Sequence, residues 1–349
     1  MHFLPTLLSA ALLSSCAILT SALHIDRRYD KAPFKPTKCA KNAKPTASPA
    51  CPIPGLPNTS GSISLSTAPV PTAWAKPHLN STYQVILQNN TEVRAEAGVD
   101  VYDIDIDSSD ATFASLLGAG KYIACYFSAG TAEDWRADFG CFNHVLGAQD
   151  LGCDLGGPWP NEFWLNTSSI EVRKIMQTRI QRAQDRGCSA IDPDNIDGYG
   201  NQNGIGATEA DSIDYIKFLS AEARSRGMGI ALKNSLEIVT EVIGEVDFAV
   251  NEQCIQYDEC DSYLPFWKLS SPLPVFNIEY PPHNGKTWTQ ANAVKKCKDS
   301  EKLGYEYLYT DLKNYPTVDC GVSRCEKSGP VPAVPKGGLV IPPGCVNGS

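Results

Sequence analysis

Three carboxylates stand close together in the middle of the chain, in the run Asp192-Pro193-Asp194-Asn195-Ile196-Asp197. This run follows a short apolar segment, Cys188–Ile191, so the acids come where a buried strand would reach solvent. A second run, Phe248–Cys254, repeats the pattern and places Glu252 directly after an apolar stretch. Carboxylates at two strand ends can hydrolyse a glycosidic bond, because one protonates the leaving oxygen while the other attacks the sugar or activates water.

The order of strand-like and helix-like segments around these acids predicts an α/β fold. We expect a (β/α)8 TIM barrel, in which catalytic groups gather at the C-terminal ends of the strands. Short β-rich runs alternate with helix-like segments from Tyr83 onward, which is typical of a parallel sheet. The nine candidate strands are Tyr83–Leu87, Val99–Ile104, Tyr122–Phe127, Phe163–Leu165, Ser189–Asp192, Gly229–Lys233, Phe248–Asn251, Pro274–Ile278 and Tyr305–Tyr309. A (β/α)8 barrel has eight strands, so one of the nine candidates must lie outside the barrel. A doubly wound open sheet is the alternative, but no Gly-rich phosphate turn follows the first strand.

Two helices are predicted with some detail. Ser169–Arg186 is amphipathic, with apolar residues such as Ile175 and Ile180 on one face and Arg179, Arg182 and Arg186 on the polar face. A second helix begins with Thr208 as N-cap and Asp211 three residues on, in a capping-box-like pattern, and ends at Gly227.

The chain divides into four segments. Residues 1–22 are apolar and end in a small-x-small pattern, so they are interpreted as a signal peptide; an uncleaved signal anchor is the alternative, and only that would attach the protein to a membrane. Residues 23–81 have the Pro/Ser/Thr/Lys-rich composition of a disordered linker. Residues 82–315 form the barrel, and residues 316–349 are a Cys/Pro-rich tail. The protein is therefore expected to be secreted, in the extracellular space or the cell wall.

The cysteines agree with export. Of the 13 in the chain, all but Cys16 lie beyond the leader, and this even remainder suits disulfides. Cys39 and Cys51 can close a loop within the linker, and Cys254 and Cys260 can brace the segment after Glu252. Cys125 and Cys188 are instead interpreted as residues of apolar strands. Glycosylation sequons occur at Asn58, Asn80, Asn89, Asn166 and Asn347.

The charge is distributed unevenly along the chain. The net charge is −9, residues 1–30 balance, and residues 31–81 contain six Lys and no acid, so residues 82–349 carry −15. Such an acidic body disfavours nucleic acid as a partner and attracts a cationic substrate. Solubility alone is the competing explanation.

Further polar residues at strand ends extend the candidate site. Any single one can be a cap or part of the solvated rim, but their recurrence suits a sugar site, where aromatics stack on the rings and polar groups bind the hydroxyls or an amine. The substrate-binding candidates are Asp103, Tyr126, Asp192, Asn195, Asp197, Asn234 and Glu279.

Other hydrolytic chemistries find little support. Beyond the leader the histidines are His24, His78, His144 and His283, and none has the spacing of metal ligands, so neither a metal nor a cofactor is expected. The chain lacks the Gly-x-Ser-x-Gly elbow of serine hydrolases.

Several of these motifs, in order, resemble glycoside hydrolase family 114, over about residues 83–309. They are Tyr102–Asp105, Cys125–Gly130 with Glu133 and Trp135-Arg136, Asp192–Tyr199, Leu232–Asn234 and Asn251–Cys254 through Tyr257 and Cys260. The first strand departs from the family, which tends to have Trp-Gln-Trp-Gln-Leu where this chain has Tyr83-Gln84-Val85-Ile86-Leu87. A sugar-stacking aromatic is therefore missing there or supplied elsewhere.

The resemblance implies a secreted endo-α-1,4-polygalactosaminidase that acts on partly deacetylated N-acetylgalactosamine polymers, the galactosaminogalactan of fungal walls and biofilms. It also implies the catalytic pair Asp194 and Glu252, with Asp192 as an alternative to Asp194. A retaining mechanism with Asp194 as nucleophile is our hypothesis; reversed roles and an inverting mechanism stay open. The alternative function is an inactive barrel that binds cationic cell-wall glycan. The protein is expected to be a monomer.

Overall fold

A computed structural model gives the fold and describes residues 50–54, 71, 73–87, 92–142, 150–157, 159–281, 290–303, 308–313 and 321–325. The predicted signal peptide, most of the predicted linker and most of the C-terminal tail lie outside the described residues, as do Cys39 and the sequons at Asn58, Asn89 and Asn347.

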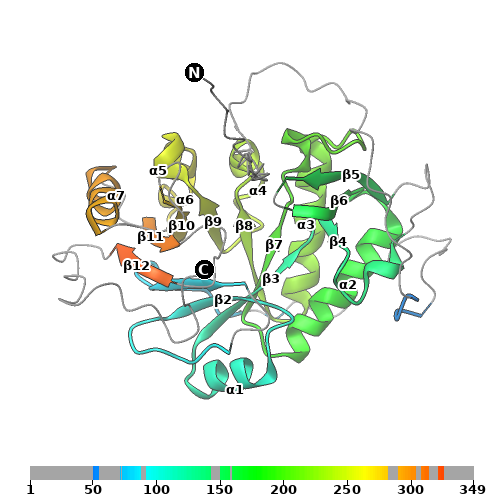
Figure 1. The fold of residues 1–349 in the computed structure, drawn as a ribbon, viewed down its shortest axis with the longest axis horizontal. Coiled ribbons are helices and arrows are strands. Elements are labelled where there is room, and N and C mark those ends of the chain that lie inside the picture. Colours follow the sequence, from blue (N-terminus) through cyan, green and yellow to red (C-terminus); the bar gives the residue numbers. More distant parts are fainter. Residues whose placement is uncertain are drawn as a thin grey trace, which may run out of the picture.

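Eight parallel strands form a nearly closed barrel, as Figure 1 shows, so the predicted TIM barrel is confirmed. The strands are β1 (Tyr83–Ile86), β2 (Val101–Asp105), β3 (Tyr122–Ser128), β7 (Ala190–Asp194), β8 (Gly229–Lys233), β9 (Phe248–Glu252), β10 (Val275–Glu279) and β11 (Leu308–Lys313). Each pairs with the next in that order, and β12 (Gly321–Cys325) adds an antiparallel edge beside β11.

Alternating side chains of these strands face opposite sides of the barrel wall. One set packs together inside the barrel, including Tyr83, whose ring stacks on Phe276 with centroids 4.5 Å apart. The other set, including Ile191 and Leu232, belongs to the larger core against the outer helices. Side chains alternate along a strand, so residues two positions apart lie on the same face; we call this the parity of a residue. Parity decides which residues at the strand ends face the interior of the barrel mouth.

The peripheral candidate among the nine predicted strands is Phe163–Leu165. It belongs to β6 (Trp159–Leu165), which pairs antiparallel with β4 (Thr131–Glu133) and β5 (Leu151–Gly156) in a small separate sheet. This sheet is inserted between β3 and the helix that precedes β7, and it lies at one side of the barrel (Figure 1). We call it the insert sheet.

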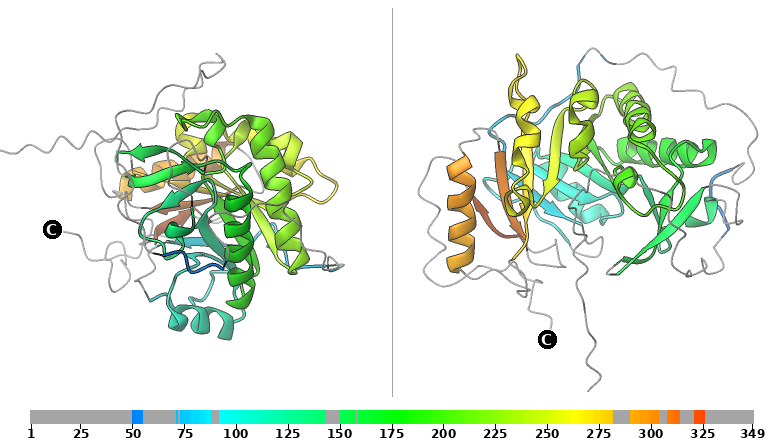
Figure 2. Two further views of the ribbon diagram at one scale, coloured as in Figure 1. Left: turned by 90° about the vertical axis from the view of Figure 1, so that its right-hand side faces the viewer. Right: turned by 90° about the horizontal axis from the view of Figure 1, so that it is seen from above.

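Helices cover the outside of the barrel, as the two views of Figure 2 show. They are α1 (Asp110–Gly118), α2 (Ile170–Asp185), α3 (Glu209–Ser225), α4 (Val239–Val242), α5 (Cys254–Tyr257), α6 (Leu264–Trp267) and α7 (Gln290–Leu303). The predicted capping box of Thr208 and Asp211 is present at the start of α3, and the left-handed Gly227 follows its end. Among the helices that the structure describes, none has the length and apolar character of a membrane span.

The polar face predicted for α2 is wrong at one residue. Arg179 is buried, and its guanidinium binds both carboxylate oxygens of Asp138 at 2.7 Å and the carbonyl oxygen of Ser128 at 2.6 Å. A buried arginine is stable there because its donors are paired. It ties the end of β3 to α2.

Four disulfides join described cysteines, and two of them correct the predictions. Cys51 pairs with Cys141, not with Cys39, and so ties the N-terminal segment to the segment after β4. Cys125 and Cys188 are bonded to each other between β3 and the start of β7. Cys254–Cys260 is confirmed, and Cys297–Cys325 joins α7 to β12.

The end of the predicted linker packs against the N-terminal ends of the barrel strands. Trp74 Nε1 donates to Asp247 Oδ2 at 3.1 Å, and Lys76 Nζ lies 2.7 Å from Asp247 Oδ1. Tyr122 Oη, at the start of β3, donates to the carbonyl oxygen of Ala75 at 3.3 Å. We call residues 73–78 the strap.

Candidate active site

The site is built on strand ends that meet at the C-terminal mouth of the barrel. Asp194 is the last residue of β7 and Glu252 the last of β9, and β8 between them ends at Lys233. All three have the parity of the barrel interior, because Ala190, Ala231 and Val250 pack in the inner core. The two carboxylates predicted as a catalytic pair therefore face the same space.

Lys233 links the two carboxylates. Its Nζ lies 3.0 Å from Asp194 Oδ1 and 3.6 Å from Glu252 Oε2. Burial lowers the pKa of Lys233, but the charges of Asp194 and Glu252 raise it more, so that its pKa is above the ordinary value and the side chain stays a cation.

Glu252 is held from both sides. Tyr280 Oη donates to its Oε1 at 2.6 Å, and Asn234 Nδ2 approaches its Oε2 at 3.4 Å. Asn234 Oδ1 also accepts from the backbone N–H of Glu252 at 2.9 Å. The left-handed Gln253 and the Cys254–Cys260 disulfide follow directly. The carboxylate is thus fixed on a rigid strand end rather than on a mobile loop.

Asp194 is oriented by neighbours on β3 and by the two residues that follow this strand. Tyr126 Oη donates to Asp194 Oδ2 at 3.0 Å. The Asp194 carbonyl oxygen accepts from the backbone N–H groups of Ala129 and Gly130 at 2.9 and 3.0 Å. Gly130 is required at this contact, because a Cβ atom there would lie 1.7 Å from the carbonyl oxygen of Asn195.

Asp103 and Asp192 form a second, deeper carboxyl pair in the barrel interior. Both are buried, and Tyr83 Oη donates to Asp103 Oδ2 at 2.7 Å. Burial raises the pKa of Asp103 to about 6. Burial and then the charge of Asp103 raise the pKa of Asp192 well above its ordinary value. Two adjacent carboxyls in such a place hold a proton between them, because both cannot ionise cheaply.

The insert sheet brings two more acids to the mouth. Glu133 on β4 and Glu162 on β6 are directly opposite in the antiparallel pair. Arg136 binds Glu133, together with Asp105 and Asp107. Glu162 accepts a hydrogen bond from Asn195 Nδ2 at 3.0 Å. Asn195 itself has a left-handed backbone conformation, and this turns its side chain toward the insert sheet.

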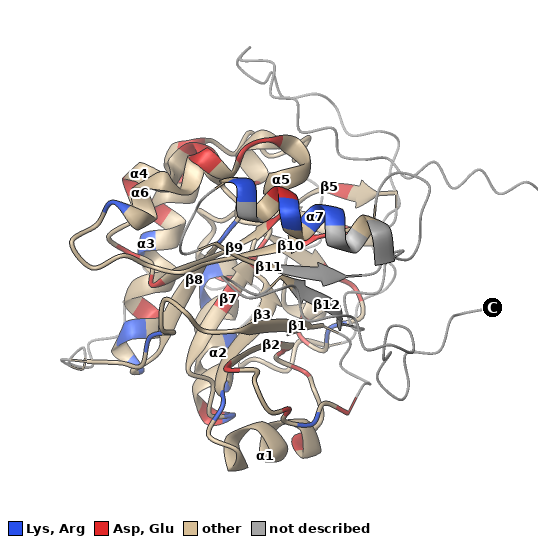
Figure 3. Ribbon diagram, turned by 90° about the vertical axis from the view of Figure 1, so that its left-hand side faces the viewer, with Lys and Arg blue, Asp and Glu red and all other residues tan. Residues whose placement is uncertain are grey.

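Two of the predicted substrate-binding residues lie in other surroundings. Glu279 is buried; its Oε1 accepts from the backbone N–H of Ile255 at 2.9 Å, and its Oε2 lies 3.0 Å from Lys296 Nζ on α7, a helix rich in basic positions (Figure 3). Asp197 is buried at the start of the 3-10 helix Gly198–Gly200, where its carbonyl oxygen accepts from Asn201 Nδ2 at 3.0 Å. These contacts fit a role in holding the loops after β9 and β7.

The site residues predicted from the sequence did not include Lys233, Tyr280 and Glu162. Strand parity would have found Tyr280: Phe276 and Ile278 face the barrel interior, so Tyr280 does as well and Glu279 does not. The same parity places Lys233 with Ala231. Glu162 has no such signal, because it reaches the mouth from the insert sheet.

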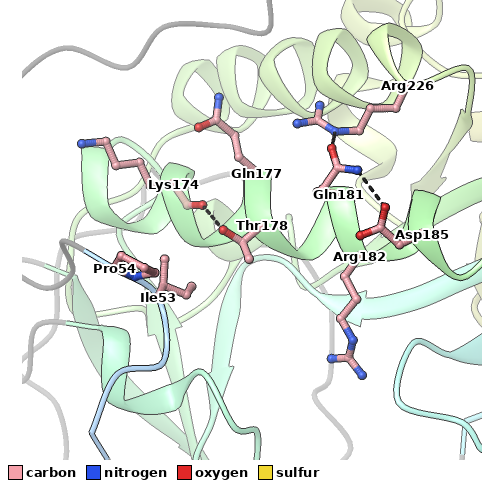
Figure 4. Close-up of a pocket in the computed structure, with 9 residues that line it drawn as sticks. All are labelled: Ile53, Pro54, Lys174, Gln177, Thr178, Gln181, Arg182, Asp185 and Arg226. Carbon is pink, nitrogen blue, oxygen red and sulfur yellow. Dashed lines mark hydrogen bonds between the residues drawn. The ribbon is translucent and has the colours of Figure 1, made fainter.

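Away from the mouth, a surface pocket of about 630 Å³ lies along the outer face of α2 (Figure 4). Its polar groups are largely paired with one another: Gln181 Nε2 donates to Asp185 Oδ1 at 3.0 Å, and Arg226 Nε donates to Gln181 Oε1 at 3.0 Å.

The described residues contain no group of His, Cys, Asp and Glu arranged to hold a metal ion.

Comparison with known proteins agrees with this geometry. The chain matches Glycoside-hydrolase family GH114 over residues 64–328. It is similar to the crystal structure of Aspergillus fumigatus Ega3 in complex with galactosamine, with 39% identity and a TM-score of 0.63, covering 71% of this chain and 97% of that one. The glycoside hydrolase domain of PelA from Pseudomonas aeruginosa is more distant, with 13% identity and a TM-score of 0.49, covering 68% of this chain and 96% of that one. Among curated protein sequences, none matches. With its family match extending over most of the chain, this protein belongs to glycoside hydrolase family GH114 and is a glycoside hydrolase.

Proposed function

We propose that this protein is a secreted endo-acting hydrolase of α-1,4 linkages in partly deacetylated N-acetylgalactosamine polymers, and that Asp194 and Glu252 are its catalytic pair. The observation that carries the proposal is the placement of both carboxylates beside one buried ammonium, Lys233, at the barrel mouth.

The surroundings of the two carboxylates support a division of roles between them. Asp194 lies nearer to Lys233 and also accepts a hydrogen bond from Tyr126, so its side chain is held in place for nucleophilic attack. Glu252 lies farther from the cation and its side chain is 31% exposed, so it can exchange protons with water. Asp192 is less suited to attack, since burial and Asp103 favour its protonated form.

In the proposed reaction, an Asp194 oxygen attacks the anomeric carbon while Glu252 donates its proton to the glycosidic oxygen. The bond between the anomeric carbon and that oxygen breaks, and the leaving sugar departs as an alcohol. Glu252, now a carboxylate, then takes a proton from water, and the resulting hydroxide attacks the same carbon and releases Asp194. The reaction consumes one water, and both carboxyls return to their starting forms.

Carboxylate spacing supports retention of configuration. The Asp194 Oδ1 and Glu252 Oε2 atoms lie 3.0 and 3.6 Å from the same nitrogen, and the sum of these distances is the largest separation that the two oxygens can have. For this pair of oxygens the limit includes the spacing of roughly 5–5.5 Å between the carboxyl groups of retaining enzymes, so the contacts with Lys233 fit retention.

The substrate class is supported by charge and by the fungal relative. Residues 82–349 carry −15, since the whole chain carries −9 and the segment before it carries six Lys in excess, and deacetylated galactosamine is a cation. The Ega3 structure, at 39% identity, is a complex with galactosamine. Disulfides among the described residues support secretion, because such bonds persist in oxidising compartments.

The test is the release of new reducing ends from purified, partly deacetylated α-1,4-N-acetylgalactosamine polymer. The wild-type protein should shorten the polymer internally, and proton NMR during the first minutes should show products of α configuration. Products that appear first as β anomers would contradict retention, and absence of cleavage would contradict the proposed substrate. Sequencing the N-terminus of protein recovered from the medium tests secretion and cleavage of the leader.

A further inference from the structure

Glu162 stands on the opposite side of Asp194 from Glu252. Glu252 belongs to β9, two strands beyond Asp194 in the barrel, whereas Glu162 belongs to the insert sheet that follows β3. Its Oε1 accepts from Asn195 Nδ2 and from Thr131 Oγ1, so the carboxyl is fixed beside the backbone that carries Asp194. A residue of a separate sheet thereby reaches the wall of the barrel mouth.

The two oxygens of this carboxyl differ in their contacts. Among the described residues, none donates a hydrogen bond to Glu162 Oε2 and none forms an ion pair with the side chain. The nearby cation, Arg136, is engaged by Asp105, Asp107 and Glu133. Glu162 is therefore a half-buried acid that is held in place but has no counter-ion in the described part of the chain.

We propose that Glu162 is a specificity-determining residue, whose Oε2 binds the ammonium group of a deacetylated galactosamine unit on the glycone side of the scissile bond. This inference rests on the proposed function. If Glu252 protonates the departing sugar, the sugars that stay with Asp194 extend away from Glu252, toward β3 and the insert sheet. An ammonium there can pair with the ionised form of Glu162, whereas a neutral acetamido group cannot.

The electrostatic surroundings of Glu162 favour the replacement of its proton by a bound ammonium group. Glu133 on β4 and Asp194 on β7 face Glu162 with negative charge, and Arg136 offsets them only in part. Burial and then the charge of Glu133 raise the pKa of Glu162 to about 8. At neutral pH the empty site therefore holds a proton on Glu162, and binding of the ammonium releases that proton to solvent. Acetylated units leave the proton in place.

The experiment compares kcat/KM on two α-1,4-galactosamine oligomers of equal length, one deacetylated and one fully N-acetylated. Glu162→Gln keeps the acceptor that Asn195 and Thr131 use but cannot ionise. We expect its preference for the deacetylated oligomer, the ratio of the two kcat/KM values, to fall roughly tenfold relative to wild type. Glu96→Gln is the matched control, because Glu96 is exposed on the loop before β2, and it should keep the wild-type ratio.

Calorimetry adds a readout that a purely structural role would not change. Titrating galactosamine at pH 7 in two buffers of different ionisation enthalpy should reveal proton release with wild type and less release with Glu162→Gln. If wild type prefers the deacetylated oligomer and Glu162→Gln keeps that preference, the inference is wrong while the proposed function stands. The inference is also overturned if wild type cleaves both oligomers equally. If wild type cleaves neither oligomer, the proposed function fails and the inference fails with it.

Discussion

The barrel carries a lysine–aspartate contact at each end, and the two contacts are built in opposite ways. At the mouth the lysine is the buried partner: the Lys233 side chain is 5% exposed, while Asp194 and Glu252 are 16% and 31% exposed. At the base the carboxylate is buried: Asp247 is fully enclosed, and its partner Lys76 is 48% exposed.

This difference gives the two ends different roles: the contact at the mouth serves catalysis, and the contact at the base holds the strap against the barrel. A buried cation at the mouth leaves its two carboxylates facing solvent, where a substrate can reach them. A buried carboxylate at the base instead receives Trp74, Lys76 and the backbone N–H of Ile230, and so holds the strap across the strand starts. Residues at the C-terminal face of such barrels serve chemistry, whereas those at the N-terminal face serve stability. Substitutions at the two ends should therefore change different quantities.

Asp194→Asn should have the largest effect. The amide cannot attack the anomeric carbon, so kcat on the polymer should fall by roughly 10³-fold or more, while the protein remains folded. Initial rates of reducing-end release and thermal unfolding measure the two quantities. Asp185→Asn removes the same charge from the exposed face of α2 and is the control. Near-normal turnover by Asp194→Asn would show that the nucleophile lies elsewhere, with Asp192 the next candidate.

Lys233→Met and Lys76→Met compare the two lysines directly. We expect Lys233→Met to lower kcat/KM by roughly 10²-fold, because preorganised charge beside the reacting groups is a large part of catalysis. Lys76→Met should leave kcat/KM unchanged and lower the free energy of unfolding by at most about 1 kcal/mol, since an exposed partner contributes little. Equal losses of activity in both variants would contradict the division between mouth and base.

The sequence was sufficient to predict the barrel and to place Asp194 and Glu252 at strand ends, because both features depend on local patterns. An apolar run followed by an acid shows a strand end, and parity along β7 and β9 keeps the acid on the inner face. The same rule, applied to β10, separates Tyr280 from Glu279. The predicted use of Glu279 ignored this parity, although Phe276 and Ile278 were in the same segment.

Other features depend on contacts between distant segments and could not be predicted locally. The Cys51–Cys141 disulfide spans 90 residues. Composition alone does not show whether Cys51 pairs with Cys141 or with Cys39. Glu162 reaches Asn195 through an antiparallel sheet that interrupts the βα alternation. Arg179 has the sequence pattern of a surface residue because its partner, Asp138, lies on another segment. In each case the pairing is fixed by tertiary structure rather than by spacing.

The deeper pair at the mouth predicts a pH dependence of stability. Burial raises the pKa of Asp103 to about 6, whereas an unfolded Asp titrates near 3.9. Between these values the folded state binds the extra proton, so the free energy of unfolding should fall as pH rises from about 4 to about 6, by roughly 2–3 kcal/mol. Asp103→Asn should flatten this slope, as measured by urea unfolding at pH 4.5 and 7. An unchanged slope would mean that Asp103 does not carry the proton.

Trp74→Ala tests the base of the barrel alone. The change removes the indole N–H that Asp247 Oδ2 accepts and the ring that packs against Arg224, 5.0 Å from its centroid. Because Lys76 and the backbone of Ile230 still bind Asp247, we expect a loss of about 1–2 kcal/mol in the free energy of unfolding. Trp159→Ala, which truncates an exposed tryptophan, controls for the loss of a large ring and should cost less. The kcat of Trp74→Ala at 25 °C should equal that of wild type, and a fall in kcat without a fall in stability would mean that the base of the barrel is coupled to its mouth.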